Sequence, residues 1–170
     1  MRAITAGLIL AAGLGLASCS KKPPPYNVTS SVKDVMAGII DPQAQVFWGS
    51  AGANDTAEGS QSLTPKTPEA WAAAEHSMTA VAEAGNLLML PGRARDDGDW
   101  IKFSKQMTDL ALQGRAAVRA KNGDEMFKTG GALYDACQGC HQKYLLPFLD
   151  ENGKPKPGSP LAGAPPAKGG

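Results

Sequence analysis

The sequence is poor in the residues that build most catalytic and metal sites. Its 170 residues include only three cysteines and two histidines, and aromatic residues make up 6%. It also lacks an excess of basic residues, because 17 Lys and Arg face 16 Asp and Glu, so nucleic-acid binding has no electrostatic support. Hydrophobic residues nevertheless make up 42% of the chain, which excludes a wholly disordered protein and suits a single domain.

A short apolar run opens the chain. Residues 1–18 predict an export signal, because Arg2 supplies a positive charge and the apolar run that follows is too short to span a bilayer comfortably. Residues 16–19, Leu-Ala-Ser-Cys, resemble the lipobox of bacterial lipoproteins. The resemblance implies cleavage before Cys19 and lipidation of Cys19, which anchors a protein stably in a membrane. Ser20 then favours the outer membrane, and the alternative is an ordinary secretory signal with a chance cysteine.

Both ends of the mature chain are predicted to lie outside the folded domain. Residues 19–29 contain three consecutive prolines, which favour a stiff, extended tether. Residues 150–170 contain five prolines and five glycines and have too little apolar surface to offset the entropy cost of ordering, so they predict a disordered tail. The domain is therefore expected at residues 30–149.

Apolar residues recur at helical spacing within this domain, and the alternating pattern typical of strands is not found. The first helical segment covers residues 31–49 and is expected to break or kink at Pro42. The second begins with Thr67 as its N-cap and Pro68 as its first residue. Residues 49–66, between the two, are expected to form a long loop.

Two further helices follow. The third is expected to be capped by Asp97 or Asp99 and to end at residues 122–123, and the fourth runs from about Asp124 to just before Pro147. The expected core face of the fourth helix consists of Phe127, Gly130, Tyr134, Cys137, His141 and Tyr144. These spacings predict an all-α protein, an antiparallel up-down-up-down four-helix bundle with the motif C-x-x-C-H in its last helix.

That motif is the most specific feature of the sequence. Residues 137–141, Cys-Gln-Gly-Cys-His, have the spacing of covalent haem attachment in c-type cytochromes. Residues three and four apart share a face of a helix. Cys137 and Cys140 can therefore form thioethers with the two vinyl groups of one haem c, while His141 reaches the iron as an axial ligand. An export signal makes attachment in the periplasm topologically possible.

Three other uses of the motif stay open. A redox-active disulfide usually opens a helix that follows a strand, whereas this motif lies near a helix end. Zinc needs a fourth ligand, and the only other histidine, His76, lies opposite the core face of its helix and is expected at the surface. A structural disulfide between Cys137 and Cys140 would make the protein a haem-free envelope lipoprotein.

A four-helix bundle with C-x-x-C-H near the end of its last helix, followed by Tyr144, resembles the cytochrome c-prime superfamily over residues 30–148. The resemblance implies two options for the second axial position of the iron. In electron carriers a Met from the first helix fills it, which suggests Met36 here, and in gas-binding members the position is open. Met89 is a further candidate ligand, and simple core packing is the other use of Met36.

In an up-down-up-down bundle the first helix begins beside the end of the fourth, so Met36 and His141 are expected at one level. The end of the second helix and the start of the third lie at that level too. The expected walls of a haem pocket are therefore Leu88, Trp100 and Phe103. Arg93, in the loop between these helices, is expected to pair with the haem propionates, and the alternative is a solvated loop of mixed charge.

Together these features predict a membrane-tethered monohaem electron carrier of the periplasm. The sequence has no catalytic triad, carboxylate pair or phosphate-binding loop, so no enzymatic activity is expected. The alternative is a five-coordinate protein that binds NO or CO, similar to cytochrome c-prime. Expected partners are transient periplasmic redox proteins and the membrane, through the lipid on Cys19, and not nucleic acid. The resemblance also implies a homodimer as an option.

Overall fold

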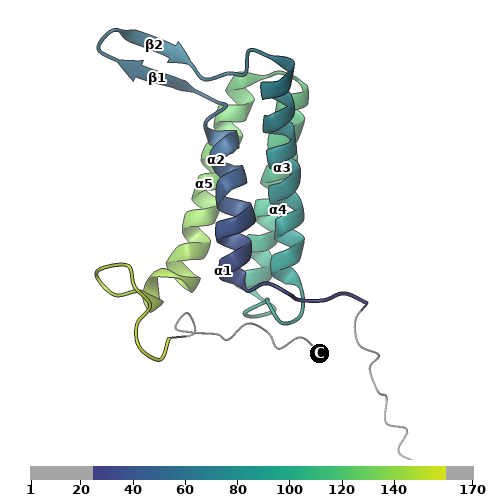
Figure 1. Ribbon diagram of the computed structural model, residues 1–170, viewed down its shortest axis with the longest axis vertical. Coiled ribbons are helices and arrows are strands. Elements are labelled where there is room, and N and C mark those ends of the chain that lie inside the picture. Colours follow the sequence, from purple (N-terminus) through teal and green to yellow (C-terminus); the bar gives the residue numbers. More distant parts are fainter. Residues whose placement is uncertain (1–24, 160–170) are drawn as a thin grey trace, which may run out of the picture.

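The computed structural model describes residues 25–159, and these are mostly helical. Figure 1 shows helices that lie side by side along the long axis, with a two-stranded hairpin projecting from one end. The predicted signal sequence, Cys19 and residues 160–170 lie outside the described residues. Within the described part of the chain, no helix is long and apolar enough to cross a membrane.

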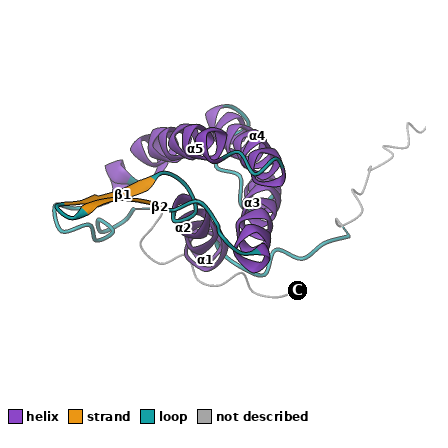
Figure 2. Cartoon of the chain, turned by 90° about the horizontal axis from the view of Figure 1, so that it is seen from above, coloured by secondary structure: helices purple, strands orange, loops and turns teal. Residues whose placement is uncertain are grey.

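The helical elements share one hydrophobic core. The first segment consists of α1 (Val32–Val35), the π-helical turn η1 (Met36–Ile40) and α2 (Asp41–Trp48). The later elements are α3 (Pro68–Met89), α4 (Asp99–Arg119), α5 (Gly123–Tyr144) and the short 3-10 helix η2 (Leu146–Phe148). α4 packs between α3 and α5, and α2 packs against α3 and more lightly against α5. Figure 2, seen along the helices, shows this arrangement as an arc.

The first segment, which was predicted to break or kink at Pro42, stays helical from Val32 to Trp48 but changes to a π-helical turn, η1, just before Asp41 and Pro42. Proline has no N–H, and in an α-helix its ring clashes with the carbonyl group four residues earlier, here that of Gly38. In η1 the turn is wider, since the N–H of Asp41 donates to the carbonyl oxygen of Met36, five residues earlier. The wider turn accommodates the proline ring and adds one residue to the helix.

Side chains cap the long helices. α3 begins as predicted, because the hydroxyl of Thr67 accepts a hydrogen bond from the backbone N–H three residues further on, at 3.2 Å. The predicted cap of α4 is wrong. Asp96, and neither Asp97 nor Asp99, accepts a hydrogen bond from the backbone N–H of Trp100, at 3.1 Å. The helix starts within a run of similar acidic residues, and the sequence alone does not distinguish which of them accepts this hydrogen bond.

The predicted core face of α5 is wrong at Phe127 and Tyr134, whereas Cys137 and Tyr144 are packed against the core as predicted. Met126 and Leu133 are fully buried, whereas Phe127 and Tyr134 are 65% and 51% exposed. Gly130 is buried as predicted. α5 carries large side chains on two neighbouring faces, and only its packing against α4 and α2 decides which of them lies in the core.

Residues 49–66 contain a hairpin where a loop was predicted. β1 (Ala53–Thr56) and β2 (Gly59–Ser62) pair antiparallel. Gly59 closes the turn with a φ of 138°, a conformation that favours glycine. Every residue of both strands is exposed, so the hairpin has no alternation of apolar and polar residues by which the sequence could signal it.

Residues 150–159, the described part of the predicted disordered tail, form local hydrogen bonds, and the disorder of the tail stays a prediction. Asp150 accepts hydrogen bonds with one side-chain oxygen and bonds through its backbone N–H to the carbonyl oxygen of Lys154, at 2.8 Å. Leu149 and Pro155 form an isolated β-bridge. Such local bonds between side chain and backbone stabilise a turn without any apolar core, which composition alone does not reveal.

α3 and α4 approach each other most closely around Gly85. A Cβ atom at this position would overlap the hydroxyl of Thr108 and would lie 3.0 Å from the carbonyl oxygen of Ser104. The same hydroxyl donates to the carbonyl oxygen of Ala82 at 3.2 Å, which joins the two helices. The close approach therefore depends on the absence of a side chain at Gly85.

We expect Gly85→Ala to lower the free energy of unfolding by about 1–3 kcal/mol, because the added methyl group forces the two helices apart. Gly131→Ala is the matched control, since a Cβ atom there meets nothing within 4 Å in the same kind of helical backbone. It should raise the free energy of unfolding by about 0.5–1 kcal/mol. Urea unfolding of both variants tests this, and equal effects would contradict it.

Candidate functional site

The C-x-x-C-H motif occupies the last turns of α5. Cys137, Cys140 and His141 are all half-buried, and both cysteines are free thiols. Their spacing of three and four residues puts the three side chains on adjoining positions of one helix face. The face is thus partly covered by the protein and partly open, as a site for a large bound group requires.

Burial sets the protonation of these groups. It raises the pKa of the Cys137 thiol above its ordinary value, and burial together with the neighbouring Cys137 raises the pKa of Cys140 to about 11. Burial also lowers the pKa of the His141 imidazole. At neutral pH both thiols are therefore protonated and the imidazole is neutral, which is the form that binds a metal.

These shifts weigh against two alternative uses of the motif. A redox-active cysteine pair needs a thiolate, and the proteins that use one lower its pKa, whereas burial here raises it. Structural zinc needs four ligands, including thiolates. Within residues 25–159 no three His, Cys, Asp or Glu side chains are arranged to hold a metal ion. His76 is exposed on α3, as predicted.

In the haem-free chain we expect alkylation of Cys140 by iodoacetamide to accelerate with rising pH up to about 11, because only the thiolate reacts. The variant Cys19→Ser/Cys137→Ser leaves Cys140 as the single thiol, and its rate should level off at a lower pH than about 11, because Cys137 contributes to the raised pKa. Cys19→Ser/Cys140→Ser is the matched control that reports on Cys137. An alkylation rate that levels off near neutral pH would mean that the protein stabilises the thiolate. That result would favour the redox-active disulfide over haem attachment.

α4 forms an aromatic wall beside the motif. The ring of Phe103 lies against Gly139, where a Cβ atom would be only 3.0 Å from Phe103 Cε1. Trp100 is buried and donates from Nε1 to the carbonyl oxygen of Leu88 at 2.8 Å. Its ring meets the ring of Tyr144 edge-on, with centroids 5.1 Å apart. Of the three predicted pocket residues, Phe103 and Trp100 thus lie beside the end of α5, and Leu88 accepts the hydrogen bond from Trp100; contact of all three with a haem stays a prediction.

Two polar contacts hold the end of α5 to the start of α4. The hydroxyl of Tyr144 donates to the carboxylate of Asp96, and Lys143 Nζ lies 2.6 Å from Asp99 Oδ2. The hydrogen bond from Tyr144 lowers the pKa of Asp96, and the one from Lys143 lowers that of Asp99. Sequence analysis missed these pairs, because partners 48 and 44 residues apart leave no local pattern.

Arg93 is not the solvated loop residue of the alternative prediction, since only 6% of its surface is exposed. Its Nε donates to the carbonyl oxygen of Ser30 at 3.0 Å, and a terminal guanidinium nitrogen donates to that of Leu87 at 3.2 Å. The side chain therefore joins the start of the domain to the end of α3. Pairing with haem propionates stays a prediction for the N–H groups of the Arg93 guanidinium that make neither of these two hydrogen bonds.

We expect Arg93→Ala to lower the free energy of unfolding by about 2–3 kcal/mol, because hydrogen bonds from a charged group are lost and two carbonyl oxygens lose their donor. The matched control is Arg95→Ala, two residues further along the same loop, where the side chain is exposed. That change should stay within about 0.5 kcal/mol. Thermal or urea unfolding separates the two, and similar losses would contradict the role of Arg93.

Trp48, at the end of α2, is where the first segment meets α5. Its Nε1 donates to the carbonyl oxygen of Gly130 at 2.9 Å, and its ring meets that of Tyr134 edge-on, with centroids 5.9 Å apart. Cys137 and His141 follow Gly130 and Tyr134 by seven residues each, which is about two turns of α5. The face of α5 that meets α2 is therefore the face that carries the motif.

Met36 lies at the matching place on the first segment. His141 is eleven residues from Gly130 along α5, and Met36 is twelve residues from Trp48, one of which is the additional residue of η1. Both are therefore about three turns, or about 16 Å, from the contact between Trp48 and Gly130. Because the two segments run in opposite directions (Figure 1), we expect Met36 and His141 at about the same level along the helices.

The first segment stands away from α5 at this level. Among the described residues, α1 and η1 make close backbone contacts with α3 but none with α5, unlike α2. Figure 1 shows the lower part of α5 leaning away from α1. Met36 is half-buried and packs against the core, and Met89 is half-buried at the end of α3. At this level the first segment therefore does not cover α5.

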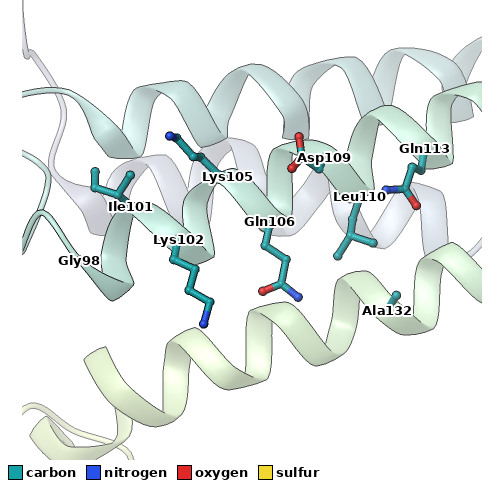
Figure 3. A pocket seen from close by; sticks show the side chains of 9 residues that line it. All are labelled: Gly98, Ile101, Lys102, Lys105, Gln106, Asp109, Leu110, Gln113 and Ala132. Carbon is teal, nitrogen blue, oxygen red and sulfur yellow. The ribbon is translucent and has the colours of Figure 1, made fainter.

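A groove of about 780 Å³ lies on another side of α5, between it and α4. Figure 3 shows Lys102, Gln106 and Leu110 projecting from α4 towards α5, with Ala132 on the opposite wall. None of the motif residues lines this groove. The groove and the motif are therefore separate features of the surface.

No family model matches this chain, and no curated protein or solved structure matches it either. The resemblance to the cytochrome c-prime superfamily accordingly stays a prediction. The function rests on the chemistry of the motif and of the residues around it.

Proposed function

We propose that this protein is a monohaem c-type cytochrome that carries electrons, with haem c attached through Cys137 and Cys140 and its iron bound by His141 and Met36. The observation that carries the proposal is the C-x-x-C-H motif, whose cysteines and histidine are half-buried on the face of α5 that meets α2. In the same proposal the helices form an antiparallel up-down-up-down four-helix bundle of the cytochrome c-prime type.

The residues of the site suit a covalent haem. Each protonated thiol can add its sulfur and its hydrogen across one vinyl group, so attachment consumes no oxidant. His141 offers a neutral imidazole, and Met36 offers a thioether, a ligand that raises the reduction potential. Phe103 and Trp100 offer apolar surface that keeps water from one side of the site. The bound haem supplies the redox chemistry.

Two axial ligands favour electron transfer over gas binding, because no position at the iron is left for a gas. Electron transfer by a bound haem requires no acid–base or nucleophilic side chain, because the cofactor supplies the redox chemistry. We therefore propose a carrier and not an enzyme, with transient redox proteins as partners. A lipid on Cys19 would tether it to a bacterial membrane on the periplasmic side, the outer membrane being favoured.

Visible spectra test the proposal on protein matured with a c-type haem assembly system. The oxidised, reduced and carbon monoxide-treated states are recorded for the wild type, Met36→Ala and the matched control Met89→Ala. We expect sharp reduced bands that carbon monoxide leaves unchanged in the wild type and in Met89→Ala. Met36→Ala should give broad high-spin bands that carbon monoxide shifts.

Three results would contradict parts of this proposal. A wild type that binds carbon monoxide favours the gas-binding alternative and leaves Met36 as a core residue. Loss of low-spin bands in Met89→Ala alone assigns the ligand to Met89. A protein whose mass shows no attached haem after maturation would favour the haem-free lipoprotein.

A further inference from the structure

We propose that Pro42 is a positioning residue for the iron ligand. Its ring imposes the π turn η1, and that turn brings Met36, in place of Ala37, onto the row that faces His141. The inference rests on the proposed haem function, because His141 is the proposed ligand on one side of the iron. The row in question is the face of the first segment that would lie on the other side.

One hydrogen bond sets the register of the first segment. In η1 the N–H of Asp41 donates to the carbonyl oxygen of Met36. In an α-helix the same N–H would donate to the carbonyl oxygen of Ala37, four residues earlier. An α-helical turn would therefore carry Ala37 to the place that Met36 has now. It would also turn Met36 by about 100° towards the place of Val35, which is buried.

Counting from Trp48 gives the same result. Trp48 is fixed to α5 by its hydrogen bond to Gly130, so the row of the first segment that faces α5 is fixed at this end. Three α-helical turns, or about 11 residues, before Trp48 is Ala37. Only with the additional residue of η1 does Met36 lie on this row, level with His141.

Pro42 is the feature that an α-helical turn cannot accommodate, because its ring would clash with the carbonyl group of Gly38. Gly38 itself does not require the wider turn. It is exposed, and a Cβ atom at this position would meet nothing within 4 Å. The identity of residue 42 therefore decides whether the turn is π-helical, and through the turn it decides which residue reaches the haem.

Haem-loaded variants of the full chain test the inference. Pro42→Ala should give the spectrum of a five-coordinate haem that binds carbon monoxide, with the helix content and unfolding temperature retained. The double variant Met36→Ala/Ala37→Met should give the same loss while Pro42 is present. Adding Pro42→Ala to that double variant should restore sharp bands that carbon monoxide leaves unchanged, because the methionine introduced one position later then takes the ligand's place. A merely structural role of Pro42 predicts no such rescue.

The outcomes separate this inference from the proposed function. If Pro42→Ala keeps the wild-type spectrum, or if the triple variant is not rescued, the inference is overturned while the carrier function stands. If the wild type itself binds carbon monoxide, the proposed ligation fails. NMR of its carbon monoxide complex then decides, since the ring current of the haem shifts the methyl group of a Met36 that lies over it. The inference is supported if this ring-current shift of the Met36 methyl group is present in the wild type and lost in Pro42→Ala. It is overturned if the wild type shows no such shift. A chain that takes up no haem overturns both.

Discussion

The hydrogen bond from the Trp48 indole to Gly130 fixes how the first helical segment meets the last. Gly130 permits this contact, because a Cβ atom there would lie only 3.2 Å from Trp48 Cδ1. The contact joins α2 to α5, while α1 and η1 rest on α3 without approaching α5. The first segment therefore covers α5 beside α2 only, and not at the level of α1 and η1.

The chemistry proposed for the motif follows from its partial burial. Partial burial among apolar side chains keeps the thiols protonated and the imidazole neutral. The same apolar surroundings suit the binding of a large flat ring system. The aromatic wall of α4 contributes to this surface through Phe103. On the outer side, the bonds from Tyr144 and Lys143 hold the last turn of α5 in place, so the apolar and polar contacts of α4 act on the same turn.

The sequence predicted the two helix ends that nearby residues decide, the start of α3 and the end of α5. Thr67 caps α3, and α5 ends before Pro147, as expected. The predictions failed where burial depends on another element. Phe127 and Tyr134 are as apolar or aromatic as core residues, but they lie beside α2 and the hairpin and stay exposed. The hairpin was missed for the opposite reason, since its polar, exposed strands carry no hydrophobic period.

The sequence by itself determined the spacing of Cys137, Cys140 and His141, because residues three and four apart on any α-helix share a face. It also determined that Pro42 lies six residues after Met36 in one helical segment. Only the tertiary structure decided which way that segment faces. The single additional residue in η1 rotates the part of the segment before it by about 100° about the helix axis. The orientation of the segment relative to α5 is fixed at its other end by the hydrogen bond between Trp48 and Gly130, which are 82 residues apart in the sequence.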